Sequence, residues 1–257
     1  MTEPHHAVLV GLVLLVGSAL QALAGFGYGL FAIPVLLLLS FQPCEAISIV
    51  GVAIIVHGAV CIWRMRHALV WHELPIMIAI GWVMQPVGVW LLSQLTLLPK
   101  TTVGQVFGGL LLVSLATRAW LRPKPREHIA TFWGWLIMIL SGTLSGLSGM
   151  SGPPIVLWVM AHRWSSDRMR VTTWTIFSAL AITNLAWQYG RFGGPVLAAA
   201  KTGLMLSPVV LVGILPGFWI SDRISHEALR RIAMGFLVLL GLYAVLQPIL
   251  LPGLNAR

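Results

Sequence analysis

Long apolar stretches, separated by short polar connections, make up almost the whole chain. An α-helix needs about 20 residues to cross the hydrocarbon core of a bilayer. We therefore predict an all-α, polytopic membrane protein. Its apolar segments cover residues 7–24, 29–40, 46–63, 74–92, 102–121, 131–145, 150–162, 171–190, 196–220 and 231–250.

Two glycine-rich interruptions break this pattern. The first reads AGFGYGLFAIP, residues 24–34, and the second reads SGLSGMSGPP, residues 145–154. Each follows one apolar run and precedes another. Backbone polar groups cannot be left exposed to lipid, so a broken helix persists only where protein or a water-filled cavity surrounds it. Paired breaks in corresponding positions of two halves indicate the binding site of a transporter.

Short matches recur in the same order in both halves of the chain. GLFAIPVLLLL resembles SGPPIVLWVM, QPVGVWL resembles LPGFWIS, and VFGGLLLV resembles AMGFLVLL. Pro86 thereby stands opposite Pro216, and Gly108 opposite Gly235. The common order predicts one transmembrane domain, residues 1–257, built from two structural repeats. The repeats cover about 5–121 and about 129–251, and a basic loop, 122–128, joins them.

The segments around the second break either cross the membrane once or dip in and return. One crossing places nine Lys and Arg residues on one side and seven on the other, whereas re-entry gives twelve against four. Cytoplasmic loops carry an excess of Lys and Arg, so re-entry is favoured. The twelve are Arg64, Arg66, Arg118, Arg122, Lys124, Arg126, Arg163, Arg168, Arg170, Arg223, Arg230 and Arg231, and the four are Lys100, Arg191, Lys201 and Arg257.

By repeat symmetry we expect the first break to re-enter as well, although residues 1–63 contain no Lys or Arg that could test this. Each half then has a broken or re-entrant glycine-rich helix and three transmembrane helices. The two repeats are inverted relative to each other, and both termini lie outside. A hairpin combined with two short crossings gives the same charge count, so that possibility stays open.

The breaks themselves are candidates for anion binding. A helix that restarts after a break presents unbonded backbone N–H groups and a partial positive charge. Glycine allows positive φ angles and close approach of the backbone, and prolines near a restart are tolerated in a first helical turn. Serine hydroxyls add donors for an oxyanion. We expect the substrate to contact Gly27, Tyr28, Gly29, Ser148, Gly149, Met150, Ser151 and Gly152. The alternative is that these glycines only permit close helix packing.

Three further polar residues lie inside apolar segments and are candidates for the same site: His57, Gln85 and Asn184. Hydrogen bonding to neighbouring helices is the alternative role for each of them. All seven acidic residues fall in connections or at segment ends, so neither a carboxylate proton relay nor a cation site is expected. An anionic substrate is therefore favoured.

Composition and charge exclude several classes of protein. Hydrophobic residues make up 58% of the 257 positions and charged residues 9%, whereas soluble domains carry about 25% charged residues. The net charge of +9 reflects loop topology rather than nucleic-acid binding. Cys44 and Cys61 have no metal or redox spacing, so no metal or cofactor is expected. The N-terminus lacks a positive n-region and a cleavage site, which indicates a retained segment. An oligomer is compatible with the sequence but not indicated by it.

The two motifs, GFGYGLFAIPVLLL and GLSGMSGPPIVLWVMA, resemble the paired glycine–proline motifs of the TauE/SafE family of bacterial inner-membrane permeases, also called sulfite exporters. The resemblance covers nearly the whole chain. It implies export or uptake of small sulfur-containing anions such as sulfite and sulfonates, among them sulfoacetate, and we favour export. It places the family's motif residues at Gly25, Gly27, Gly29, Pro34, Gly146, Gly149, Gly152 and Pro154.

The sequence is compatible with three rival functions. The stretches 146–149 and 149–152 both fit the GxSG pattern of rhomboid-like intramembrane serine proteases, for which His57 is the one deep candidate base. The first break contains Tyr28 and no serine, which argues that the break rather than a nucleophile is functional. The second rival is a transporter of another small anion, and the third is a scaffolding membrane protein.

Overall fold

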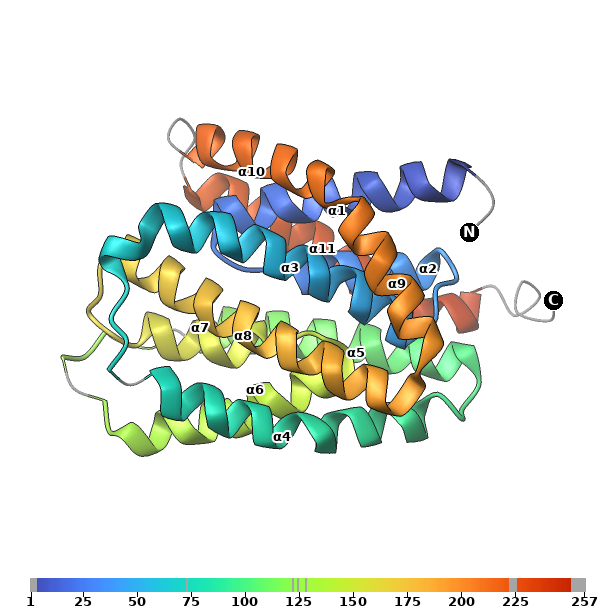
Figure 1. Ribbon diagram of the computed structural model, residues 1–257, viewed down its shortest axis with the longest axis horizontal. Coiled ribbons are helices and arrows are strands. Elements are labelled where there is room, and N and C mark those ends of the chain that lie inside the picture. The colour runs from blue at the N-terminus through green and yellow to red at the C-terminus, as the bar shows by residue number, and fades with distance from the viewer. Residues whose placement is uncertain are drawn as a thin grey trace.

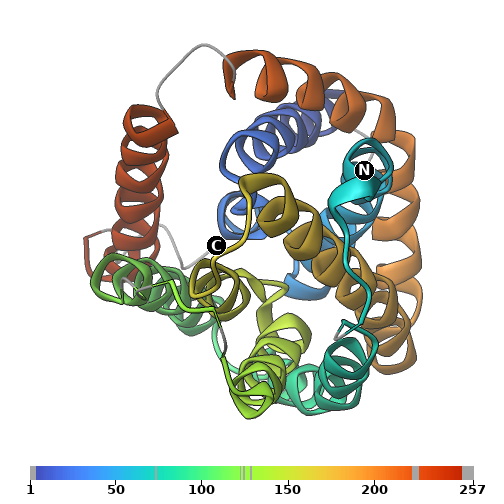
Figure 2. The same cartoon turned by 90° about the vertical axis from the view of Figure 1, so that its left-hand side faces the viewer.

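The computed structural model describes residues 4–72, 74–121, 123, 125–127, 129–221 and 226–250. These residues form a helical bundle with no β-strand among them, and Figure 2 views many of the helices nearly end-on (Figures 1 and 2). The helices are α1 (Pro4–Ala24), α2 (Tyr28–Leu38), α3 (Pro43–Met65), the 3₁₀ turn η1 (Arg66–Ala68), α4 (Leu74–Leu95), α5 (Lys100–Trp120), α6 (Thr131–Ser148), α7 (Gly152–Met160), α8 (Ser166–Phe192), α9 (Gly194–Met205), α10 (Ser207–Ser221) and α11 (His226–Leu250). The all-α prediction is confirmed.

The predicted single segment 196–220 is wrong. It consists of two helices, α9 and α10, whose axes are bent by 52° at Leu206. Pro208, the second residue of α10, has no N–H group and cannot continue the hydrogen-bond ladder of α9. The ladder stops where Leu206 N–H bonds to the Thr202 carbonyl at 3.0 Å, and it restarts with Val209 N–H bonded to the Leu206 carbonyl at 3.0 Å. The other nine predicted segments each overlap one helix.

Several helices are long and apolar enough to cross a membrane. Among the described residues, four qualify by length and composition, namely α1, α3, α4 and α6, and a fifth span results if the bent α9–α10 pair is counted as one. Many large apolar side chains on the outer surface of the bundle are exposed, for example Trp63, Trp90 and Leu215. An apolar exterior of this kind is what lipid tails require.

Glycine-lined contacts between the two halves of the chain hold the bundle together. α1 packs on α10, and α4 packs on α6. A Cβ atom added to Gly213 of α10 would lie 2.6 Å from the Leu15 carbonyl oxygen, and one added to Gly142 of α6 would collide with the Gly81 backbone. Small residues let helix backbones approach closely where lipid offers no hydrophobic driving force.

The directions of these helix pairs follow a pattern. The partners run parallel in α1–α10 and in α4–α6, and antiparallel in α3–α8, where Gly51 meets Leu185 and Gly58 meets Ser178. Figure 1 shows the antiparallel course of α3 and α8 by their colours. The α5–α11 pair is also antiparallel, since Gln105 meets Val245 while Gly241 meets Leu112.

At each glycine-rich break the chain doubles back into a hairpin. The chain just before α6 and just after α7 is hydrogen-bonded: Arg126 N–H donates to the Ala161 carbonyl at 2.8 Å, and Arg163 N–H donates to the Arg126 carbonyl at 3.2 Å. α6 therefore begins, and α7 ends, at the same end of the bundle. In the first hairpin, the hydroxyl of Tyr28 at the start of α2 reaches back to the carbonyl of Leu14 in α1 at 2.9 Å.

Basic residues gather at the end of the bundle where this pairing occurs. In Figure 1, α3, α5 and α7 end and α4, α6 and α8 begin at the left, whereas α1 and α5 begin and α11 ends at the right. Nine of the twelve residues assigned to the cytoplasm belong to described parts of the chain near the left-hand end, which is the grouping that re-entry predicts. Outside the described residues lie Arg122, Lys124, Arg223 and Arg257.

This arrangement predicts the accessibility of introduced cysteines. Leu97, 78% exposed, lies between α4 and α5, and Ser166 begins α8 at the opposite end. Both native cysteines are buried, so background labelling is low. On intact bacterial spheroplasts, a membrane-impermeant maleimide is expected to label Leu97→Cys, and to label Ser166→Cys only after lysis. Labelling of both variants from the same side would contradict the arrangement, and the reversed pattern would invert its orientation.

Candidate anion site

The two breaks have backbone conformations that require glycine. Gly25 and Gly27, between α1 and α2, have φ angles of 78° and 107°, and Gly149, at the end of α6, has φ of 67°. Side chains disfavour this left-handed region. Gly25 N–H bonds to the Gln21 carbonyl at 2.8 Å and Gly149 N–H to the Ser145 carbonyl at 2.9 Å. Each glycine therefore ends one helix so that a second helix can start in a new direction.

The two breaks touch each other at the centre of the bundle, although about 120 residues separate them in the chain. A Cβ atom on Gly29 would lie 2.9 Å from the Gly149 carbonyl oxygen. One on Gly149 would lie 2.7 Å from Cδ1 of Ile33 and 3.4 Å from Ile47. Gly29 and Gly149 are thus close-approach positions as well as candidate site residues.

The helices that restart here, α2 and α7, begin next to this contact. Their N-cap residues are Gly27 and Ser151, and neither provides a side-chain capping hydrogen bond. The first N–H groups of a helix have no partner within it and carry the positive end of the helix dipole. Two such helix starts thus lie near one point, with Gly152 as the first residue of α7.

A small cavity, which we call the central cavity, lies at this point. Its volume is about 20 Å³. A cavity of this size holds about one water molecule. Three of the predicted site residues, Gly149, Ser151 and Asn184, line it together with apolar side chains. The residues that line it are Ile33, Ile47, Val50, Gly51, Ile54, Ser145, Gly149, Ser151, Phe177, Ala181 and Asn184.

Amide side chains of α8 hold the end of the broken helix α6. The Asn184 Nδ2 group donates to the Ser145 carbonyl at 2.9 Å, and the Gln188 Nε2 group donates to the Gly146 carbonyl at 3.0 Å. These carbonyls belong to the last turn of α6, where an internal partner is missing or shared. Sequence reasoning missed Gln188 and Ser145, although Gln188 follows Asn184 by one helical turn.

Gln85 joins the same polar group from α4. Its Nε2 atom donates to the Leu180 carbonyl at 2.7 Å and to the Ser145 hydroxyl at 3.3 Å. Its Oε1 atom accepts from the hydroxyl of Thr183 at 2.7 Å. Gln85 is fully buried but does not line the central cavity. These contacts tie α4, α6 and α8 together next to the second break.

His57 lies outside the central cavity and is fully buried. The hydroxyl of Ser18 donates to the Val210 carbonyl at 2.7 Å, so it accepts from His57 Nδ1, 3.1 Å away. The opposite nitrogen, Nε2, then accepts from the Cys61 thiol at 3.4 Å. This neutral, fully hydrogen-bonded histidine links α1, α3 and α10.

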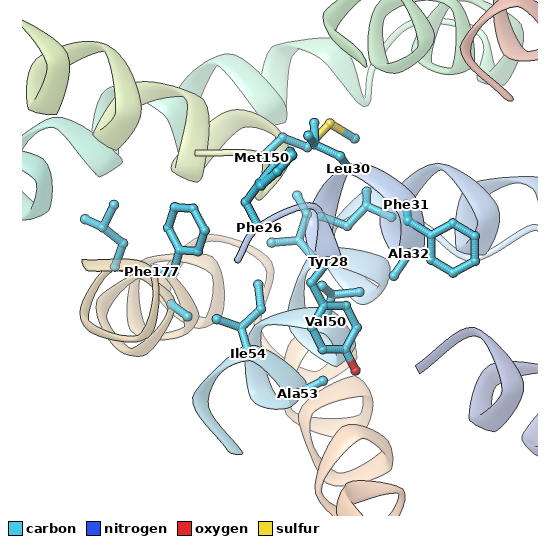
Figure 3. Packing of buried hydrophobic residues seen from close by; sticks show 14 of the residues in the cluster. Phe26, Tyr28, Leu30, Phe31, Ala32, Val50, Ala53, Ile54, Met150 and Phe177 are labelled. Carbon is cyan, nitrogen blue, oxygen red and sulfur yellow. The ribbon is translucent and has the colours of Figure 1, made fainter. Parts of the chain in front are cut away.

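The remaining predicted side chains also have partners. The Tyr28 ring packs into space left by Gly17, and its hydroxyl bonds to Leu14, so its side chain lies against α1. The Met150 side chain joins Phe26 and Leu30 in the apolar cluster of Figure 3. Neither Tyr28 nor Met150 lines the central cavity.

The protease alternative needs a serine next to a histidine. The Ser148 hydroxyl donates to the Leu144 carbonyl at 3.0 Å and accepts from Met150 N–H at 3.3 Å. Both ring nitrogens of His57 bond to Ser18 and Cys61. Among the described residues, the Ser148 hydroxyl and the His57 ring therefore belong to separate hydrogen-bond networks. Nor do these residues contain a group of three or more His, Cys, Asp or Glu side chains that could hold a metal ion.

Comparison with known proteins identifies the family. The family model described as "Sulfite exporter TauE/SafE" matches residues 9–244. The chain belongs to the TauE/SafE family. It is also similar to a "Probable sulfite/organosulfonate exporter TauE" from Cupriavidus necator, with 27% identity over an alignment of 265 positions that covers 96% of each chain. No solved structure matches the chain.

Membership of the TauE/SafE family, together with the apolar helices, makes this chain a multi-pass membrane transporter. The match begins inside α1 and ends inside α11, so it includes both glycine-rich breaks. The family resemblance predicted from the two motifs is confirmed.

Proposed function

We propose that this protein exports small sulfur-containing oxyanions, such as sulfite and sulfoacetate, across the bacterial inner membrane. The anion binds at the midplane between the two glycine-rich breaks. The observation that carries the proposal is the contact between Gly29 and Gly149, which places the start of α2 against the end of α6, three residues before α7 begins at Gly152. The Cupriavidus relative, named as a sulfite/organosulfonate exporter, supports the substrate class.

The charge of the site favours an anion. None of the described residues that line the central cavity carries an ionised side chain. The local field there comes from helix ends, and two helix starts contribute partial positive charge. Backbone N–H groups and the Ser151 hydroxyl are donors suited to the oxygens of a sulfite or sulfonate group. A cation would need carboxylates or several free carbonyl oxygens. Among the described lining residues, the buried amide oxygen Oδ1 of Asn184 has no hydrogen-bond partner, and no carboxylate accompanies it.

In this proposal, the structure corresponds to a closed state of the site. A cavity that holds one water cannot hold a sulfite ion, which has four non-hydrogen atoms. Ile33 of α2 and Phe177 of α8 occupy the surrounding space, so α2 or α8 must move when the anion enters. The membrane potential then favours anion export by about 2.3 kcal/mol per charge per 100 mV.

We also propose that the two halves form an inverted repeat. A two-fold axis across the bundle would exchange the α1–α10 pair with the α6–α4 pair, and would pair α3 with α8 and α5 with α11. Two helices that such an axis exchanges must run antiparallel to each other. The α3–α8 pair and the α5–α11 pair both do. Inverted repeats place a shared substrate site at the repeat interface.

The test is transport by the purified protein in liposomes. Wild-type protein is expected to move sulfite and sulfoacetate, and Ser151→Leu, which fills the central cavity, is expected to reduce the rate by about tenfold or more. Gly109→Ala is the control, because a methyl group there would meet open space. Equal rates for wild type and Ser151→Leu would place the site elsewhere. Movement of other anions but not of sulfur oxyanions would overturn the substrate class.

A further inference from the structure

A second, much larger cavity opens beside the first hairpin. Its volume is about 410 Å³. This lies within the range of small-molecule sites, about 300–1,000 Å³. We call it the α2–α5 cavity. Its walls are the second half of α2, the α2–α3 and α4–α5 connections, the first two turns of α5 and one residue of α11. It lies at the end of the bundle away from the clustered basic residues, where α5 begins and α11 ends (Figure 1).

The α2–α5 cavity has a mixed polar and apolar lining that carries one positive charge. Of the described residues that line it, Lys100 alone is ionised, and Ser40, Gln42, Thr96 and Thr101 add polar atoms. Pro34, Leu37 and Phe107 belong to its apolar wall. The Glu45 carboxylate lies nearby but accepts a hydrogen bond from Gln42 N–H at 2.9 Å and does not line the cavity.

The helix α2 lines both this cavity and the central cavity. Ile33 lines the central cavity and the next residue, Pro34, lines the α2–α5 cavity. Proline has no N–H group, so α2 lacks the hydrogen bond from residue 34 to the Leu30 carbonyl. The helix that the two cavities share is therefore short and lacks one internal hydrogen bond.

We propose that the α2–α5 cavity is the outer vestibule of the anion pathway and that Lys100 concentrates anions in it. The proposal rests on the function proposed above. A single fixed charge beside a low-dielectric wall raises the local concentration of ions of opposite sign. The effect weakens as salt shortens the Debye length, which is about 10 Å at 0.1 M. The ligand class is a small oxyanion, which enters or leaves by displacement of α2.

The first test measures the field in the cavity without any transport. Thr101→Cys places a thiol in the lining, and its reaction rate is measured with an anionic methanethiosulfonate reagent and with a cationic one. At low ionic strength, adding Lys100→Gln is expected to lower the anionic-to-cationic rate ratio by about tenfold. Lys100→Arg should keep the ratio. Lys201→Gln is the matched control, because Lys201 is exposed on α9 and does not line the cavity.

The second test connects the cavity to transport. Lys100→Gln is expected to raise the KM for sulfoacetate about threefold to tenfold at low salt with little change in maximal rate, and Lys201→Gln to leave both unchanged. Sulfoacetate should also slow modification of Thr101→Cys. The vestibule proposal is overturned if Lys100→Gln leaves the anionic-to-cationic modification rate ratio unchanged. It is also overturned if Lys201→Gln changes that ratio by the same amount. A changed ratio without sulfoacetate transport or protection would instead overturn the proposed substrate.

Discussion

Replacement of Gly29 by alanine is expected to reduce transport by about 100-fold or more. The added methyl group would lie 2.9 Å from the Gly149 carbonyl oxygen, and backbone atoms cannot move aside as a flexible side chain can. The two breaks would have to separate, which displaces the starts of α2 and α7 from their common point. Displacements of about 1 Å in a positioned site commonly cost about two orders of magnitude in rate. Initial uptake of labelled sulfite into inverted vesicles measures the effect.

The control for this variant is Gly11→Ala, in the same hairpin. A methyl group at Gly11 would lie 3.9 Å from Leu206, an ordinary van der Waals distance. This variant should transport at the wild-type rate, and both variants should reach the membrane in similar amounts. Full activity of Gly29→Ala would show that the close contact between the breaks is not needed for transport, and the proposed site would have to be abandoned.

Replacement of Gly88 by alanine is expected to produce the largest loss of stability. A methyl group there would collide with the Thr143 carbonyl oxygen and lie 2.6 Å from the Leu147 backbone nitrogen. It would push α4 away from α6 and strain the Gln85 hydrogen bonds next to it. Overpacking of this kind costs about 1–3 kcal/mol or more. The midpoint of thermal unfolding in detergent should fall by several degrees.

Gly109→Ala provides the comparison for stability. Apart from its own helical neighbours in α5, no atom of the described residues lies within 4 Å of a Cβ placed at Gly109, which belongs to the interior of that helix. Alanine is a better helix former than glycine by about 1 kcal/mol. Gly109→Ala should therefore unfold at the wild-type temperature or slightly above it. If Gly88→Ala is as stable as Gly109→Ala, the α4–α6 interface is looser than the structure indicates.

The helices and the two breaks could be predicted from the sequence because their signals are local. Apolar runs of sufficient length specify helices in lipid, and glycine and proline specify where a helix stops. The bend at Leu206 had a local signal too, Ser207–Pro208, but the apolar run hid it. Gln188 could have been found by its helical spacing from Asn184. Lys100 had no such signal, because its relation to Pro34 exists only after α5 packs beside α2.

The order of the amino acids alone is enough to assign an all-helical membrane protein of the TauE/SafE family with two glycine-rich breaks. Three contacts follow only from the packed helices: Gly29 touches Gly149, Tyr28 bonds to Leu14, and His57 bonds to Ser18. The physical reason is the sequence separation over which each kind of interaction acts. Helix formation and termination depend on neighbours a few residues away, whereas these contacts depend on which helices pack together and how closely small residues let them approach.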